Sequence, residues 1–159
     1  MEFLTYQQWD LLADAYIPVM GVIAVVTAVN RARQKHRNGL FLCVSPLVLS
    51  LDFVYVLMGI DRFWNLWPRM GLDYSTHLAV AMALVAFLAK TRPNGRAPLA
   101  SSLVLYALLM IYQAYHTAFD LVATAIPILI GLWFIYQKWP KHPIVATNRH
   151  EFAGQPGME

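Results

Sequence analysis

The sequence predicts an all-α integral membrane protein, folded as one helical bundle of about five transmembrane helices. Of its 159 residues, 58% are hydrophobic and only 13% are charged, which is about half the charge of an ordinary soluble domain. The mean hydropathy is +0.48. These values exclude a disordered chain, and the single Cys43 excludes a disulfide scaffold or a multi-cysteine zinc site.

Five apolar stretches are long enough to cross a membrane, which takes about 20 residues. The first, IPVMGVIAVVTAV, lies between Asp14 and Arg31, and the second contains a single acid, Asp52. The third starts with the polar run GLDYSTH and stays apolar as far as Lys90. The next apolar block is too long for one crossing at about 1.5 Å per residue, so we divide it at the polar cluster QAYHTAFD. The predicted spans are 13–31, 39–60, 71–90, 98–115 and 119–138.

The basic residues predict the orientation, because short loops rich in Lys and Arg stay in the cytoplasm. Ten of the twelve basic residues fall on one side of the predicted bundle, and only Arg62 and Arg69 fall on the other. We therefore expect a bacterial inner-membrane protein with its N-terminus outside and its C-terminus in the cytoplasm. The ten are Arg31, Arg33, Lys35, Arg37, Lys90, Arg92, Arg96, Lys138, Lys141 and Arg149.

Two consequences follow for the organisation of the chain. Residues 1–138 are expected to form a single transmembrane domain, and residues 139–159 a short polar cytoplasmic tail. The net charge of +3 reflects topology, so we expect membrane lipids as neighbours and no nucleic-acid partner.

This topology brings ionisable residues from three separate elements to the outer, periplasmic face. His77 lies near the start of the third span, His116 ends the fourth, and Asp120 opens the fifth; Arg62 and Arg69 lie in the outer loop. Each has a simple structural interpretation as well: an interfacial histidine, a helix cap, or cations that meet lipid headgroups. Together they favour a functional site, because ionisable groups at membrane depth are costly.

The chemistry of this set fits a phosphate ester. Two arginines can hold non-bridging oxygens, and the start of the third span offers backbone N–H groups around Ser75 and Thr76 that favour an anion. One imidazole can attack phosphorus if a carboxylate fixes its tautomer, and a second can protonate the leaving oxygen.

In these residues the chain resembles the type 2 phosphatidic acid phosphatase superfamily, whose motifs are K-x6-R-P, P-S-G-H and S-R-x5-H-x3-D. The counterparts here are RFWNLWPR from Arg62 to Arg69, YSTH ending at His77, and HTAFD from His116 to Asp120. The order of the motifs and their placement between spans also match. The sequence departs from the pattern at Arg62, Met70, Thr76 and Met110, where the family has Lys, Pro, Gly and Arg.

The resemblance implies an enzyme, a lipid phosphatase or phosphotransferase acting at the outer leaflet on a lipid phosphomonoester or isoprenyl diphosphate. By resemblance, His116 is the nucleophile that forms a phosphohistidine, Asp120 its orienting partner and His77 the general acid. Arg62, Arg69, Ser75 and Thr76 would bind the substrate, with no metal and no cofactor.

Three alternatives remain open on the residues alone. The missing third-motif arginine favours a catalytically inactive, phosphatase-like structural or lipid-binding subunit. His77 and His116 could ligate one haem iron in a redox protein, or, with Asp120, a zinc ion in a lipid hydrolase.

Overall fold

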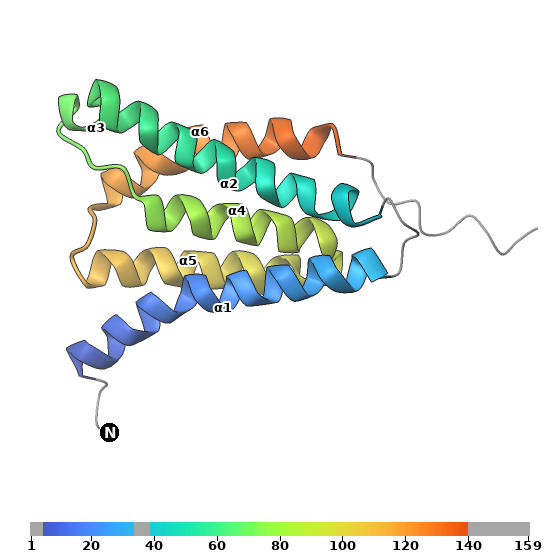
Figure 1. The fold of residues 1–159 in the computed structure, drawn as a ribbon. Helices are drawn as coiled ribbons and strands as arrows, with labels where there is room; N and C mark the ends of the chain where they lie inside the picture. The colour runs from blue at the N-terminus through green and yellow to red at the C-terminus, as the bar shows by residue number, and fades with distance from the viewer. Residues whose placement is uncertain (1–4, 34–38, 140–159) are drawn as a thin grey trace, which may run out of the picture.

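The structure is a computed structural model that describes residues 5–33 and 39–139, and it is a bundle of helices (Figure 1). Within these ranges no strand occurs, which confirms the predicted all-α class. Most of the predicted tail, together with Lys35, Arg37, Lys141 and Arg149, lies outside the described residues. The elements are α1 (Tyr6–Arg33), α2 (Gly39–Trp64), α3 (Leu66–Arg69), α4 (Thr76–Thr91), the 3₁₀ turn η1 (Pro93–Gly95), α5 (Arg96–Tyr112) and α6 (Ala118–Gln137).

Four helical segments are long and apolar enough to cross a membrane: Tyr6–Arg33, Val44–Trp64, Pro93–Tyr112 and Ala118–Gln137. The predicted third span, 71–90, is shorter than expected. Residues 71–75 form a loop, and α4 begins only at Thr76, because Ser75 is its N-cap and accepts a hydrogen bond from Leu78 N–H at 3.4 Å. With 16 residues, α4 is about 24 Å long, below the thickness of about 30 Å of a bilayer core.

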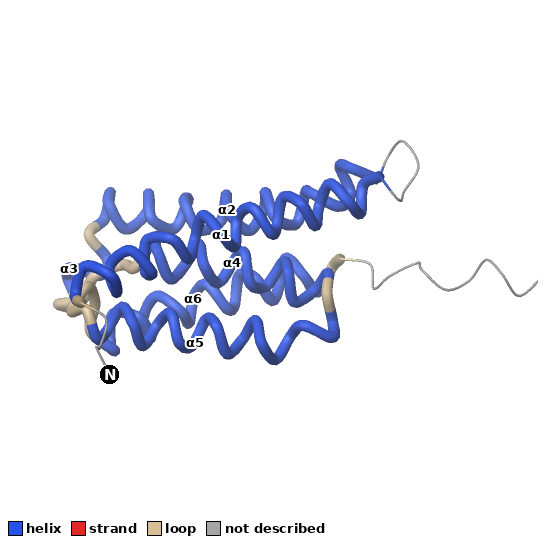
Figure 2. Tube along the Cα trace, turned by 90° about the horizontal axis from the view of Figure 1, so that it is seen from below, coloured by secondary structure: helices blue, strands red, loops and turns tan. Residues whose placement is uncertain are grey.

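The short helix α4 is the centre of the bundle. It packs against α1, α2, α5 and α6, and Figure 2 shows it running between the pair α1 and α2 and the pair α5 and α6. A helix that is hydrophobic all round is typical of a protein interior. Its buried residues are Leu78, Ala79, Val80, Ala81, Met82, Ala83, Leu84, Val85, Phe87 and Leu88.

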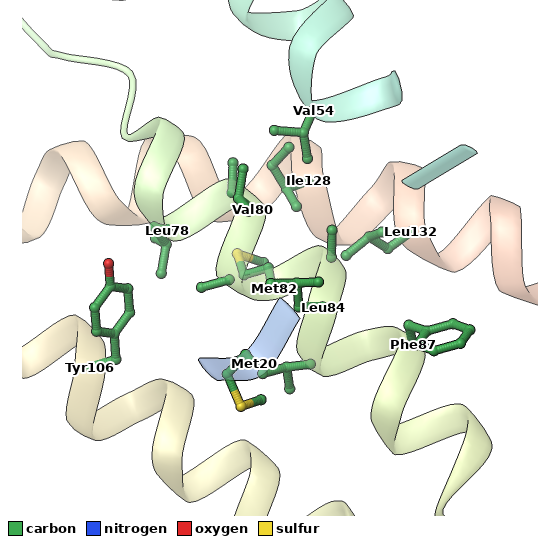
Figure 3. Close-up of a cluster of buried hydrophobic side chains, with 14 of the residues drawn as sticks. Met20, Val54, Leu78, Val80, Met82, Leu84, Phe87, Tyr106, Ile128 and Leu132 are labelled. Carbon is green, nitrogen blue, oxygen red and sulfur yellow. The ribbon is translucent and has the colours of Figure 1, made fainter. Parts of the chain in front are cut away.

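The packing around α4 combines small side chains on α4 itself with larger side chains from its neighbours. Ala79, Ala81 and Ala83 have no exposed surface, so neighbouring helices can approach its backbone closely. Larger side chains from three other helices, Met20, Val54 and Ile128 among them, fill the space around it (Figure 3).

Helix α1 bends near its first third (Figure 1). Pro18 lies inside this helix, and because proline has no N–H it leaves the carbonyl of Asp14 without its helical partner. The bend directs the first turns of α1 obliquely across the end of the bundle where α4 begins.

The described basic side chains divide unequally between the two ends. Arg62 and Arg69 lie at the end where α4 begins, which also carries α3 and the turn between α5 and α6 (Figure 1). The opposite end carries Arg31, Arg33, Lys90, Arg92, Arg96 and Lys138.

We expect Gly131→Ala to destabilise the contact between α2 and α6. A Cβ at Gly131 would overlap the ring of Phe53, and overpacking of this kind typically costs about 1–3 kcal/mol. Unfolding in mixed detergent micelles measures the loss. Gly59→Ala is the matched control, since nothing lies within 4 Å of a Cβ there. Equal stability of the two variants would contradict the expected overlap.

Candidate functional site

A cavity of about 350 Å³ lies at the end of the bundle where α4 begins. Its lining comes from five places in the chain: α1, the loop before α4, the first turn of α4, α5, and the turn that follows α5. The structure therefore brings His77 and His116 to one cavity, as the topology predicted. The lining residues are Ala13, Asp14, Asp73, His77, Tyr106, Met110, Tyr115 and His116.

His77 lies in the first turn of α4 and is exposed. The position of this turn is fixed from α6, because the backbone N–H of Ser75 donates to Thr124 Oγ1 at 3.0 Å. Ser75 and Thr124 both have no exposed surface. This hydrogen bond therefore fixes the position of the first turn of α4, which carries His77, along the axis of α6.

The turn that carries His116 begins directly after the C-terminus of α5, which is closed by backbone hydrogen bonds. Tyr115 N–H donates to Met110 O at 3.1 Å, and Ala114 has a positive φ of 57°. This is the pattern of a Schellman motif, in which glycine usually takes the left-handed position. An alanine there is strained, and the turn directs both Tyr115 and His116 to the cavity.

The carboxylate beside His116 is that of Asp73. Its Oδ2 lies 3.5 Å from His116 Nδ1, which is too long or too poorly directed for a hydrogen bond, since Nδ1 has no hydrogen-bond partner. The side chain of His116 is only 11% exposed, whereas that of Asp73 is 73% exposed. A largely buried imidazole thus faces a solvent-exposed carboxylate at the cavity.

Asp120 does not take the orienting position that the resemblance implied. Its Oδ2 accepts hydrogen bonds from Thr117 N–H at 2.8 Å and Thr117 Oγ1 at 2.7 Å, and its Oδ1 accepts from Asp73 N–H at 2.8 Å. These bonds complete a capping box at the start of α6. Thr117 is the N-cap of α6 and Asp120 is its partner in the capping box. Asp120 also positions the backbone of Asp73, the residue that faces His116.

The predicted substrate-binding residues are not gathered at the cavity. Arg62 and Arg69 are exposed at the same end of the bundle but do not line it. The Ser75 hydroxyl is buried and used as the N-cap of α4, and Thr76 is partly buried beside it. The sequence placed the arginines at the correct end, but spacing alone does not give the direction of their side chains.

The loop between α2 and α4 is nevertheless rigidly built. Asp61 Oδ1 accepts from Trp67 N–H at 2.8 Å, and the Trp67 ring packs edge-on against Tyr74 at 5.0 Å. Tyr74 Oη donates to Val54 O at 3.1 Å. Burial raises the pKa of Tyr74 well above its usual range, and the Asp61 carboxylate adds to the rise. Tyr74 is therefore a neutral structural donor.

Sequence reasoning missed Asp14 and Tyr106, which line the cavity from α1 and α5. Tyr106 stacks on Tyr16, with ring centroids 4.2 Å apart. Tyr115, which also lines the cavity, donates to Asp10 Oδ1 and so ties the first turns of α1 to the turn that holds His116. Asp14, the one acidic residue in the first predicted span, was the signal available in the sequence.

The described residues contain no group of three His, Cys, Asp or Glu side chains that could hold a metal ion. The zinc alternative required His77, His116 and Asp120 to converge, but both oxygens of Asp120 are hydrogen-bonded to Thr117 and Asp73. The cavity is therefore a histidine and aspartate pocket without a metal-binding arrangement in the part of the chain that the structure describes.

Comparison with known proteins adds no assignment, since no protein-family model, curated protein or solved structure matches the chain.

We expect Thr124→Val to destabilise the site end of the bundle. The substitution keeps the shape but removes the acceptor of Ser75 N–H, and an unsatisfied buried donor costs about 1–3 kcal/mol. Unfolding in mixed micelles measures the change. The matched control is Thr27→Val, because Thr27 Oγ1 is buried without a partner and its loss should be neutral or stabilising. A neutral Thr124→Val would show that the Ser75 bond does not hold α4.

Proposed function

We propose that this cavity is the catalytic site of a membrane-embedded lipid phosphatase or phosphotransferase that acts through a phosphohistidine. The observation that supports it best is the meeting of His77 and His116, from separate elements, at one cavity. A carboxylate faces Nδ1 of the more buried histidine, at 3.5 Å. A nucleophile, its orienting carboxylate and a second imidazole are the groups that this chemistry needs.

In the proposed reaction Nε2 of His116 attacks phosphorus, and the bond from phosphorus to the lipid alcohol breaks. The leaving oxygen takes a proton from the His77 imidazolium. Asp73 stabilises the positive charge on His116 through Nδ1. Water, or the hydroxyl of a second lipid, then attacks the phosphohistidine; neutral His77 accepts its proton, and His116 is released.

The charged side chains at the cavity bear on how an anionic substrate would bind. Asp14 and Asp73 line it, and neither Arg62 nor Arg69 does. Positive potential comes instead from the N-terminal end of α4. The two arginines, exposed at the same end, suit attraction of an anionic headgroup from the surrounding lipid. The proposed substrate is a lipid phosphomonoester or an isoprenyl diphosphate, whose anionic headgroup these arginines would attract.

The distribution of cations supports a periplasmic location for the site in a bacterial inner membrane. Six described basic residues lie at the end opposite the cavity and two lie at the cavity end. By the positive-inside rule the cavity end faces outward, so the substrate headgroup belongs to the outer leaflet.

Phosphate release from lipids tests the proposal. The purified protein should hydrolyse at least one of phosphatidate, phosphatidylglycerol phosphate and isoprenyl diphosphates, and His116→Ala should lower kcat by about 10⁴-fold or more, because the nucleophile is lost. His77→Ala should lower it by about 10²- to 10⁴-fold. Tyr112→Phe, an exposed position outside the cavity, is the control. Equal rates for parent and His116→Ala, or none on any lipid, would refute catalysis.

Two aspartate variants distinguish the residue that orients His116 from the residue that completes the capping box of α6. Asp73→Asn should lower kcat by about 10²-fold or more while leaving thermal stability nearly unchanged, since its side chain is exposed. Asp120→Asn should lower the melting temperature, because the capping box and the Asp73 anchor are weakened. A fall in kcat for Asp120→Asn alone, without a change in stability, would return the orienting role to Asp120.

One observation favours a second candidate, a phosphatase-like lipid-binding subunit without catalysis. Among the residues that the structure describes, no arginine lines the cavity, so the positive charge that would stabilise a transferring phosphoryl group is reduced. The same assay decides between the two, because this candidate binds a lipid phosphate with no phosphate release. An absorption spectrum with a Soret band would instead assign the two histidines to haem.

A further inference from the structure

We propose that a groove between α5 and α6 binds the acyl chain of an anionic phospholipid, with Lys90 and Arg96 holding its phosphate. The groove lies toward the end of the bundle opposite the histidine cavity. It does not depend on the proposed function.

The groove exists because α5 and α6 both pack on α4 but hardly touch each other. The space between them measures about 410 Å³. Val85, Ala86 and Ala89 of α4 form its floor, while Leu103 of α5, and Leu132 and Trp133 of α6, form its walls. Trp133 is 57% exposed, so the groove opens to the side, where lipid surrounds the bundle.

Two cations lie at the end of this apolar groove. Lys90 Nζ donates to Tyr136 O at 3.4 Å, and Arg96 Nε donates to Ala89 O at 3.1 Å. These bonds hold both side chains in place while leaving further N–H donors on each. Neither forms an ion pair with an acid among the described residues, and paired cations are what a phosphate group requires.

The lining of the groove favours a lipid chain. The groove follows α4 from Met82 to Lys90, a rise of about 12 Å, and the side chains along it are apolar as far as the two cations. Its layering, apolar walls followed by Trp133, Tyr136 and then cations, matches the order of tail, interface and headgroup in a bilayer leaflet.

Native mass spectrometry of the full chain in detergent, with equimolar phosphatidylglycerol and phosphatidylcholine, tests this site. Each cation near a membrane surface contributes about fivefold, so phosphatidylglycerol should be preferred about 25-fold at low ionic strength. The variant Lys90→Gln with Arg96→Gln should bind both lipids nearly equally. Arg92→Gln with Lys138→Gln removes the same charge from exposed positions at the same end and should keep the preference.

The acyl chain is tested separately. Ala86→Phe fills the floor of the groove and should reduce retention of both lipids, and free glycerol phosphate should not displace them. Equal binding of the two lipids by the parent protein would overturn the proposal, as would an equal loss of preference in the two charge variants. Displacement of the lipids by glycerol phosphate would show that the cations bind a phosphate headgroup alone, and it would overturn the proposed binding of the acyl chain.

Discussion

The burial of α4 on every side is the constraint on which the rest of the structure depends. Four helices must surround it, so each of them is left with one face on α4 and another toward lipid. Its alanines allow this close approach. Because protein covers it, α4 can be shorter than the bilayer core. The histidine cavity forms above one end, and the cations of the groove gather at the other.

The sequence predicts most of this architecture because length and hydropathy are properties of single helices. It fails at the start of the third span, where GLDYST was counted as membrane helix although Ser75 before an apolar run is a typical N-cap signal. Hydropathy also does not show that one apolar helix is enclosed by the others. That depends on which faces meet, and the apolar residues of α4 occur on all of its faces.

The candidate site was predictable in part for the same reason. Helix order alone brings His77 and His116 to one end, but rotation of each helix decides which other side chains join them. Asp14 and Tyr106 line the cavity for that reason and escaped prediction. Asp73 was missed because Asp120, four residues after His116, was the nearer candidate. Thr117 and Asp120 form a capping box, and Asp120 also holds the backbone of Asp73, whose carboxylate lies 3.5 Å from His116 Nδ1.

The five main helices of the described residues alternate in direction, so the two ends of the bundle carry unequal numbers of helix N-termini and C-termini. Three helices, α1, α4 and α6, begin at the cavity end and finish at the other, whereas α2 and α5 run the opposite way. Aligned peptide dipoles make helix N-termini positive and C-termini negative. Asp120, in the first turn of α6, lies at one of these positive N-termini.

At the opposite end the cations meet helix C-termini directly. Arg31 donates to Thr91 O, Arg96 to Ala89 O and Lys90 to Tyr136 O, so the last carbonyls of α4 and α6 are capped by basic side chains. The same residues that predict orientation by the positive-inside rule therefore also stabilise helix ends. Lys90 and Arg96 keep further N–H donors after these bonds. Those donors are the ones that we propose bind a lipid phosphate.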